Sequence, residues 1–450
     1  MSMINVKDLV LFTGRLSEIS RQLVHSLDGT LIKDWDIIIG EDLLWPLVGT
    51  LAKKWNVPVV HFSNALDFQP RNLPPWSYPM YGTGYTEDLT FFHRLHLTLL
   101  LPIQRVFINF FETSVLVGDS YLGDLKESIR PGIMTPFIVS TSLGFEYPRP
   151  LLPLLHYVGP MIKNPNTQQH MDGHLEAWLN FQANRSVIYI SMGTTVHLSD
   201  SQVAAITNGV LSSTYNALWS LRDTVSLEVV YRIVGNQNKH RFFLADWLPQ
   251  QRILQHRSIA MAIVHGGMGG ASQCLYYGVP EIIIPFAHDQ RDVAARVVSG
   301  GAGVVIDKDS ITAMRVAEAI RTVSSAPYRE AARRFRKTFQ LGGGTQRAAD
   351  LVEFYADVGY EHLVPAYAKH KWSSVKYYNI DVYALLLILL LLTVYTSCWF
   401  CKCCFQHCCR CRGHTYYTAG CVRLKQTLFL TVLVVVIYIF ITGCYVFLSY

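Results

Sequence analysis

A histidine followed by closely spaced glycines is the part of this sequence best suited to binding a charged ligand. An apolar stretch that ends at Val264 leads directly into His265, and a helix is expected over 270–277. Glycines let a ligand approach the backbone closely, and the unpaired N–H groups of a helix start attract anions. The pattern predicts a diphosphate site, although a tight turn without a ligand would produce the same pattern. The site would contain His265, Gly267, Gly269 and Gly270.

Asp289 and Gln290 lie where the next expected strand ends and its helix begins. A carboxylate beside a carboxamide can hydrogen-bond neighbouring hydroxyls of a sugar. Asp is also common at helix N-caps, so a purely structural role for Asp289 is equally open.

Two further segments offer complementary chemistry. Trp247 presents a flat ring for stacking on a base and Gln250 can pair with an amide edge, although an isolated Trp is more often a core residue. Ser191, Gly193 and Thr194 lie at the end of another expected strand, where they could line phosphate oxygens or form a turn. Each segment alone is weak evidence. Together they predict a site for a nucleotide-diphosphate sugar.

The elements that must position these residues alternate between strand and helix. Apolar strands are expected at 186–191, 217–221, 260–264, 281–284 and 303–306, and helices at 201–211, 270–277, 290–298 and 312–323. This alternation predicts a parallel sheet that is buried on both faces. Such a sheet binds ligands at the carboxyl ends of its strands, which is where the residues above fall.

A shorter α/β region precedes this one. Strands at 36–40 and 58–62 with a helix at 43–54 predict a βαβ unit, and an apolar helical stretch follows at 89–115. His93 and His96 share a face of that stretch, where packing is more common than metal ligation because no third ligand follows at suitable spacing. We predict an N-terminal domain over 1–145, a proline-rich linker over 146–172 and a second domain over 173–370.

Composition excludes several classes of protein. Of the 450 residues, 50% are hydrophobic and only 16% are charged, which excludes extensive disorder. The formal charge of +6 and the lack of a long basic run in the soluble part argue against a nucleic-acid partner. Cys274 is the only cysteine before Cys398, so no disulfide is expected within the large soluble part.

The C-terminal end is typical of a membrane anchor. An uncharged apolar run predicts a transmembrane helix over 382–401, and a less regular second span is expected over 426–450. The intervening loop, 402–425, carries basic but no acidic residues, which predicts a cytosolic loop and a luminal large domain. Residues 1–20 lack the features of a signal peptide, so we expect that an upstream segment is missing.

Two modification sites follow from the same topology. The cysteines between 401 and 411, together with His407, could bind zinc, but adjacent Cys pairs beside a membrane helix favour S-palmitoylation. Asn184, Arg185 and Ser186 form an N-glycosylation sequon that would be used only in a luminal domain.

The motifs together resemble the signature of the UDP-glycosyltransferases, which include the membrane-bound glucuronosyltransferases of animals. The resemblance covers most of 35–399 and implies a GT-B fold: two Rossmann-like α/β domains, the first truncated, followed by one or two transmembrane helices. It also implies a membrane location in the endoplasmic reticulum. It rests on WLPQxxILxH at 247–256, HGG at 265–267, YYGVP at 276–280 and DQ at 289–290, with EYPRPLLP at 146–153 and VGP at 158–160.

The resemblance assigns roles by position. It implies that Trp247 stacks on uracil, that Gln250 contacts the nucleoside and that His265 with the following turn binds the diphosphate. Ser191 and Thr194 would also line the diphosphate. A UDP-sugar is then a co-substrate, and neither a cofactor nor a catalytic metal is expected.

The sugar would be held by Asp289 and Gln290. Three positions depart from the family pattern. Gln273 replaces a Glu that binds the ribose hydroxyls, Gly269 replaces an Asn beside the phosphates, and Ser220 replaces an Arg of many glucuronosyltransferases.

The general base is the part of the site that the motifs do not locate. In the family it is a His on an early loop, oriented by an Asp, and it takes the proton of the acceptor hydroxyl. The region expected to hold this His is absent here. Glu41 falls at the position of the orienting Asp, although a solvated strand-end carboxylate is an equal alternative; His25 and His61 are the remaining candidates for the base.

Two functional hypotheses follow. The first is a membrane-anchored enzyme that transfers a hexosyl or glucuronosyl group from a UDP-sugar, with inversion, to a lipophilic hydroxyl acceptor bound near 89–111. The alternative is a catalytically impaired UDP-sugar-binding paralogue or regulatory partner. A nucleotide-sugar epimerase is disfavoured because no Gly-x-Gly-x-x-Gly motif opens either domain. The lipid bilayer is the other expected partner, and self-association is left open.

Overall fold

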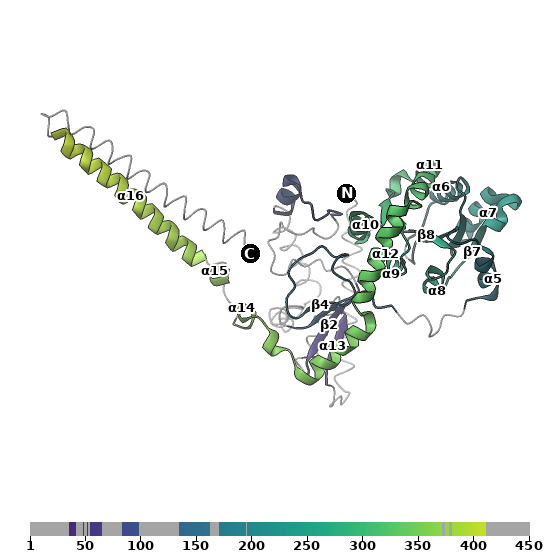
Figure 1. Ribbon diagram of the computed structural model, residues 1–450, viewed down its shortest axis with the longest axis horizontal. Helices are drawn as coiled ribbons and strands as arrows, with labels where there is room; N and C mark the ends of the chain where they lie inside the picture. Colours follow the sequence, from purple (N-terminus) through teal and green to yellow (C-terminus); the bar gives the residue numbers. More distant parts are fainter. Residues whose placement is uncertain are drawn as a thin grey trace. The chain divides into compact units, whose positions relative to one another are not determined.

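The computed structural model describes residues 36–41, 48, 52, 55–64, 83–98, 135–162, 171–194, 196–370, 374–377 and 380–410. The chain divides into two units, residues 1–365 and 366–450. In the first unit, the described strands form two parallel sheets (Figure 1).

The larger sheet has six strands in the order β10-β9-β8-β5-β6-β7. Residues of β5 alternate between two cores: Val187 and Tyr189 face one, and Ile188 and Ile190 face the other. β8 is buried along its whole length, as expected for a strand covered on both faces. The strands are β5 (Val187–Ser191), β6 (Asn216–Ser220), β7 (Phe242–Ala245), β8 (Ile259–Val264), β9 (Glu281–Ile283) and β10 (Gly303–Val305).

Helices connect these strands and cover the sheet (Figure 1). α6 begins with a capping box between Ser199 and Gln202, which satisfies N–H groups at the helix start. The predicted strands and helices of this region are all confirmed with closely matching ends. The helices are α5 (Gly173–Phe181), α6 (Asp200–Leu211), α7 (Thr224–Asn238), α8 (Gln250–Leu254), α9 (Met268–Tyr276), α10 (Gln290–Ser299), α11 (Ala313–Val323) and α12 (Ala326–Leu341).

The smaller sheet has four parallel strands in the order β1-β2-β3-β4. β1 (Ile38–Glu41) and β2 (Val59–Ser63) occur where predicted, whereas β3 (Phe137–Val139) and β4 (Leu155–Tyr157) were not anticipated. β4 lies inside the range predicted as a linker, 146–172, and pairs with β3. Three-residue strands are too short to produce a recognisable alternation, so only the pairing reveals them. Most of the helix predicted at 43–54 lies outside the described residues.

A helix from late in the sequence completes the core of the smaller sheet. α13 (Gly344–Val358) packs Leu351 and Tyr355 against Val60 and Ile138. The range 173–370, predicted as the second domain, therefore supplies a helix to the sheet of the first. An amphipathic pattern identifies the apolar face of a helix but not the sheet that it covers.

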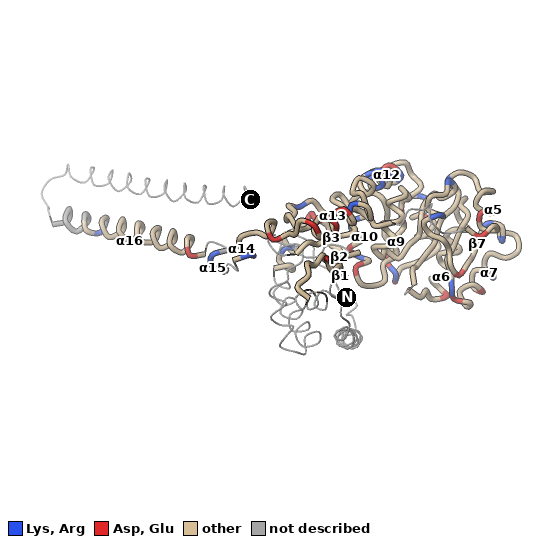
Figure 2. The backbone as a smooth tube through the Cα atoms, turned by 90° about the horizontal axis from the view of Figure 1, so that it is seen from below, with Lys and Arg blue, Asp and Glu red and all other residues tan. Residues whose placement is uncertain are grey.

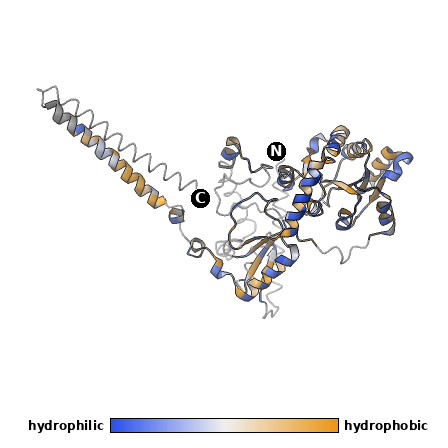
Figure 3. Ribbon diagram, viewed as in Figure 1, coloured by the Kyte–Doolittle hydropathy of each residue, from blue (hydrophilic) through white to orange (hydrophobic). Residues whose placement is uncertain are grey.

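The second unit contains α14 (Ala366–Lys369), α15 (Ser374–Tyr377) and α16 (Ile380–Arg410). Within α16, Ile380–Phe400 is long and apolar enough to cross a membrane by length and composition. The helix is tan through its middle in Figure 2 and largely orange there in Figure 3. α16 extends to Arg410, so the first part of the predicted loop 402–425 is helical, because no Gly or Pro interrupts it.

Several predictions for this end fall outside the described residues. These are the second span at 426–450, the later part of the loop and most side chains of the cysteine cluster. Among the described residues, no group of His, Cys, Asp and Glu could hold a metal ion.

Candidate functional site

The strand order of the larger sheet reverses between β5 and β8. From β5 the chain builds β6 and β7 on one side, and later β8, β9 and β10 on the other. Open parallel sheets bind ligands at strand carboxyl ends beside such a reversal. Ser191, the last residue of β5, is paired with Val264, the last of β8. The segments after both strands, which hold Gly193 and His265, therefore meet at the same edge.

The imidazole of His265 lies between two glycines. A Cβ on Gly193 would stand 2.6 Å from its Cε1 atom, and a Cβ on Gly267 would stand 2.5 Å from its Nε2 atom. Gly193 also has a φ of +71°, which side chains rarely adopt. Burial lowers the pKa of His265, against a smaller opposing effect of the Ser191 backbone. The ring is thus neutral at physiological pH and can donate one N–H.

The start of α9 is open in the described part of the chain. Its N-cap, Gly267, provides no side-chain hydrogen bond to the first turn. A Cβ on Gly269 or Gly270 would meet no atom within 4 Å. Unpaired N–H groups and the positive end of the helix dipole therefore face space that could receive an anion.

Trp247 lies in the connection between β7 and α8 and is not a core residue. Its side chain is 67% exposed. The guanidinium carbon of Arg222, which follows β6, lies 5.0 Å from the centre of the Trp247 ring. An exposed indole at a strand end suits base stacking. Arg222 was not predicted from the sequence, although a basic residue directly after an expected strand of this sheet could have indicated a place in the site.

Gln250 and Gln273 form a hydrogen-bonded pair. Gln250 Nε2 donates to Gln273 Oε1 at 2.9 Å, and Tyr189 OH donates to Gln250 Oε1 at 3.0 Å. The pair connects the residue expected at the nucleoside with the residue expected at the ribose. Tyr189, in the middle of β5, was not singled out from sequence, because nothing local marks a strand tyrosine as a support for a distant glutamine.

Asp289 and Gln290 differ in what their side chains do. Gln290 is buried, and its Oε1 accepts hydrogen bonds from the N–H groups of Phe286 at 2.7 Å and Ala287 at 3.1 Å. Gln290 thereby shapes the loop before α10. Asp289 occupies the N-cap position of α10 without a side-chain cap hydrogen bond, so the capping interpretation is not supported. Burial raises the pKa of Asp289. His288 beside it has a φ of +55°, an uncommon backbone conformation for a residue with a side chain.

The candidates for acid–base chemistry are separated from these residues in the sequence. Glu41 is exposed at the carboxyl end of β1. His61 is fully buried in β2, which makes it unsuited to contact an acceptor. His25 lies outside the described residues. His93 and His96 pack against Tyr85, which agrees with the packing interpretation.

The sequence profile of the family described as UDP-glucoronosyl and UDP-glucosyl transferase matches residues 23–415. The chain belongs to this family. Mouse UDP-glucuronosyltransferase 2A1 is 25% identical over 372 residues, which cover 78% of this chain and 66% of that protein. Mouse 2-hydroxyacylsphingosine 1-beta-galactosyltransferase is 24% identical over 413 residues, which cover 84% of this chain and 72% of that protein. The chain thus spans about two thirds to seven tenths of the length of these curated relatives.

Solved structures of glycosyltransferases share the fold. The calicheamicin glycosyltransferase CalG4 matches with a TM-score of 0.55 at 18% identity, over 80% of this chain and 82% of that one. UDP-glucose: anthocyanidin 3-O-glucosyltransferase in complex with UDP matches with a TM-score of 0.54 at 18% identity, over 80% and 83%. The family membership and the GT-B fold that the motifs predicted are therefore confirmed.

Proposed function

We propose that this chain is a membrane-anchored transferase that moves a hexosyl or glucuronosyl group from a UDP-sugar to a hydroxyl group of a lipophilic acceptor. The observation that carries the proposal is the arrangement of His265 between Gly193 and Gly267 at the open start of α9. A neutral imidazole N–H and unpaired backbone N–H groups suit a diphosphate. The family membership supports UDP as the nucleotide.

The remaining donor residues follow from their positions. Trp247 offers its exposed ring to uracil, Gln250 and Gln273 reach the nucleoside, and Ser191 and Thr194 line the diphosphate beside His265. Asp289 accepts hydrogen bonds from sugar hydroxyls, while Gln290 fixes the loop from which Asp289 projects. Because the side chain of Gln290 is hydrogen-bonded to backbone N–H groups, the carboxylate of Asp289 is the main contact to the sugar in this proposal.

The reaction requires an in-line displacement at the anomeric carbon. The acceptor oxygen forms a bond to this carbon, the bond to the UDP oxygen breaks with inversion, and a general base takes the hydroxyl proton. Charge that develops on the departing diphosphate is stabilised by the first N–H groups of α9 and by His265. Glu41 is proposed as the carboxylate that orients the base. Phe91 and Phe92, which are exposed on the helical residues 91–98, suit the acceptor side because their rings are apolar.

A second candidate function is favoured by the Gln250–Gln273 pair. The Oε1 atom of Gln273 already accepts a hydrogen bond from Gln250, so it has less capacity to accept from ribose hydroxyls than a carboxylate would. A catalytically impaired paralogue that binds UDP-sugars, or a regulatory partner, would tolerate this change.

A turnover assay separates the two functions. The full-length protein in detergent would be incubated with UDP-glucose, UDP-galactose or UDP-glucuronate and a panel of lipophilic alcohols, and UDP release and glycoside formation would be measured. Glycoside formation supports the transferase. Saturable UDP binding with neither transfer nor donor hydrolysis would favour the paralogue.

The proposed membrane topology has an independent test. Asn184 lies at an exposed turn, so an oligosaccharide could be attached there without unfolding the sheet. If the large unit faces the lumen of the endoplasmic reticulum, glycosidase treatment should shift the electrophoretic mobility of the wild-type protein but not of Asn184→Gln. A wild-type protein that carries no glycan, together with protease accessibility of this unit from the cytosol, would contradict the luminal placement.

A further inference from the structure

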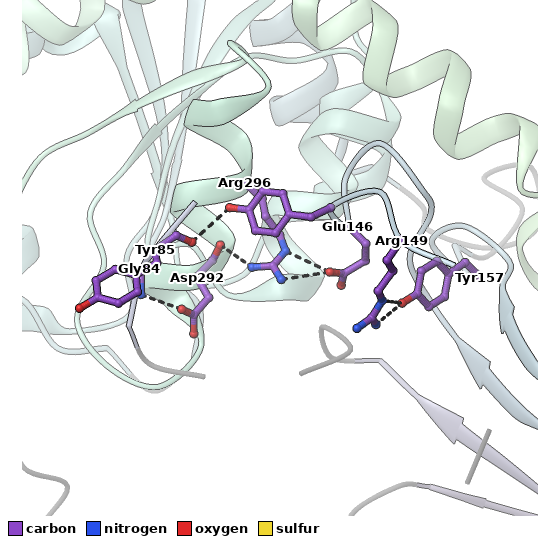
Figure 4. A network of polar contacts seen from close by, with 8 residues as sticks. Gly84, Tyr85, Glu146, Arg149, Tyr157, Asp292 and Arg296 are labelled. Atoms are coloured by element: carbon purple, nitrogen blue, oxygen red, sulfur yellow. Dashed lines mark hydrogen bonds and ion pairs between the residues drawn. The ribbon is translucent and has the colours of Figure 1, made fainter. Parts of the chain in front are cut away.

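The helix that begins at the proposed sugar-binding residues carries buried charges. α10 starts beside Asp289 and Gln290, and farther along it Asp292 and Arg296 are each only 2% exposed. Charged side chains are almost never buried to this extent unless they are paired. Both residues bind partners outside the six-stranded sheet and its connections, Gly84 and Glu146 (Figure 4).

Arg296 binds the segment that follows β3. Its Nε and Nη2 atoms lie 3.1 and 3.0 Å from Oε2 of Glu146, which is itself fully buried. Its Nη1 atom donates to the Asp292 carbonyl at 3.1 Å, and its guanidinium lies 4.6 Å from the centre of the Tyr147 ring. Breaking such a pair on one side leaves an uncompensated buried charge, so separation of Arg296 from Glu146 is strongly disfavoured.

Asp292 and Tyr147 hold a loop of the N-terminal region from two sides. Asp292 Oδ1 accepts a hydrogen bond from the Gly84 N–H at 2.8 Å, and Tyr147 OH donates to the Tyr85 carbonyl at 3.3 Å. The contact between Asp292 and Gly84 can be followed in Figure 4. A carboxylate acceptor makes the first of these the stronger of the two.

The contacts continue from this loop into the helical residues 91–98. The ring of Tyr85 stacks on His93 with centroids 4.1 Å apart, and its hydroxyl lies 3.1 Å from Nδ1 of His96. A continuous set of contacts thus leads from α10, where the donor sugar is proposed to bind, to the segment proposed for the acceptor side. We call residues 83–98 the docked segment.

We propose that Asp292, Arg296 and Tyr147 are positioning residues that fix the docked segment to α10, so that UDP-sugar binding at the start of α10 orders the acceptor side. The inference rests on the proposed function for its ligand. A helix moves as one body over two turns, and the buried Arg296–Glu146 pair prevents α10 from shifting without its partners. Binding of the UDP-sugar would then order the docked segment before the acceptor binds.

Hydrogen–deuterium exchange of the full-length protein in detergent, with and without a UDP-sugar (UDP-glucose, UDP-galactose or UDP-glucuronate), tests the inference. Asp292→Ala removes the acceptor for Gly84, and Tyr147→Phe removes the second hydrogen bond while keeping the ring beside the Arg296 guanidinium. Glu330→Gln is the matched control, because Glu330 forms an exposed ion pair with Arg333. Peptides from the docked segment are compared with peptides from β5 and β8.

Without the UDP-sugar, the docked segment should exchange about tenfold faster in Asp292→Ala than in wild type, with a smaller acceleration in Tyr147→Phe and none in Glu330→Gln. Exchange in β5 and β8 should not change. With the UDP-sugar, exchange in wild type should slow at both 265–270 and the docked segment, whereas in Asp292→Ala it should slow only at 265–270. A purely structural anchor would not produce this loss of the distant response to the UDP-sugar.

Each other outcome has a definite meaning. Equal exchange of the docked segment in wild type and Asp292→Ala, or an unchanged response to the UDP-sugar in that variant, would overturn the inference. Protection at 265–270 by the UDP-sugar without protection of the docked segment in wild type would leave the proposed function standing and refute the coupling. Absence of protection by each of the three UDP-sugars would refute the proposed function and the coupling together. If exchange in Asp292→Ala is also faster in β5 and β8, that variant is destabilised as a whole. The inference is then tested by the response of the docked segment in Tyr147→Phe.

Discussion

The imidazole of His265 lies against Gly193 so closely that position 193 has no room for a side chain, since a Cβ there would stand 2.6 Å from Cε1. This relationship joins the end of β5 to the end of β8 at the point where the sheet reverses its strand order. The ring that we assign to the diphosphate is thus held by the backbone of a neighbouring segment.

Gly193→Ala should displace the His265 ring and weaken UDP binding by tenfold or more, which corresponds to about 1.4 kcal/mol. Part of the effect on stability comes from the φ of +71°, which costs roughly 1 kcal/mol with a side chain. Gly235→Ala is the control, because Gly235 has a φ of +59° and a Cβ at that position would meet no atom within 4 Å. Calorimetric titration with UDP should show the loss only at position 193; similar affinities for both variants would count against the role of the ring.

Gln273→Glu should strengthen UDP binding. A carboxylate can keep the hydrogen bond from Gln250 and still accept from the ribose hydroxyls, and charge-assisted hydrogen bonds are about twice as strong as neutral ones. We expect a gain of several-fold in titrations with UDP. No gain should occur with a UDP analogue that lacks both ribose hydroxyls, or in the exposed control Gln255→Glu. An equal gain with that analogue would show that position 273 does not read the ribose.

Glu281, the first residue of β9, should make stability fall as pH rises. It is fully buried, both of its carboxyl oxygens lack hydrogen-bond partners in the described part of the chain, and burial raises its pKa well above the usual range. The folded state therefore keeps a proton that the unfolded chain releases near pH 4.3, so stability is greatest below that pH and is lost as pH rises towards the folded pKa.

Thermal unfolding of Glu281→Gln at pH 5 and pH 8 measures this effect. The variant should gain stability relative to wild type at pH 8, and the gain should shrink at pH 5. Glu330→Gln, at an exposed position, should match wild type at both pH values. A gain of the same size at both pH values would mean that folded Glu281 holds no more protons than the unfolded chain over this pH range, so that its pKa is not raised.

Five strands of the larger sheet could be predicted from sequence because each of these apolar strands is followed by a helix with a recognisable boundary; β7, whose residues are only partly buried, was not predicted. The donor residues at 191–194, 247–250, 265–273 and 289–290 were grouped for the same reason, since parallel strands bring their carboxyl ends to one edge. The assignment of these residues to a UDP-sugar remains a prediction.

Other features depend on pairing that no local pattern records. β3 and β4 are three residues each, and α13 gives no sign in its own sequence that it packs on the smaller sheet. The buried pair of Glu146 and Arg296 joins residues 150 positions apart. A charged residue within an apolar segment indicates that its charge is paired in the folded protein, but only the fold identifies the residue with which it pairs.

Titration calorimetry with UDP, uridine and pyrophosphate on Trp247→Ala and His265→Ala tests the central claim most directly. Stacking of a base on an aromatic ring contributes about 1–3 kcal/mol, so Trp247→Ala should weaken UDP and uridine binding by roughly fivefold to a hundredfold. His265→Ala should weaken UDP and pyrophosphate but not uridine. Tyr231→Ala, at an exposed aromatic residue of α7, should bind all three as wild type does. Folded Trp247→Ala and His265→Ala proteins with the wild-type affinity for UDP would contradict the account.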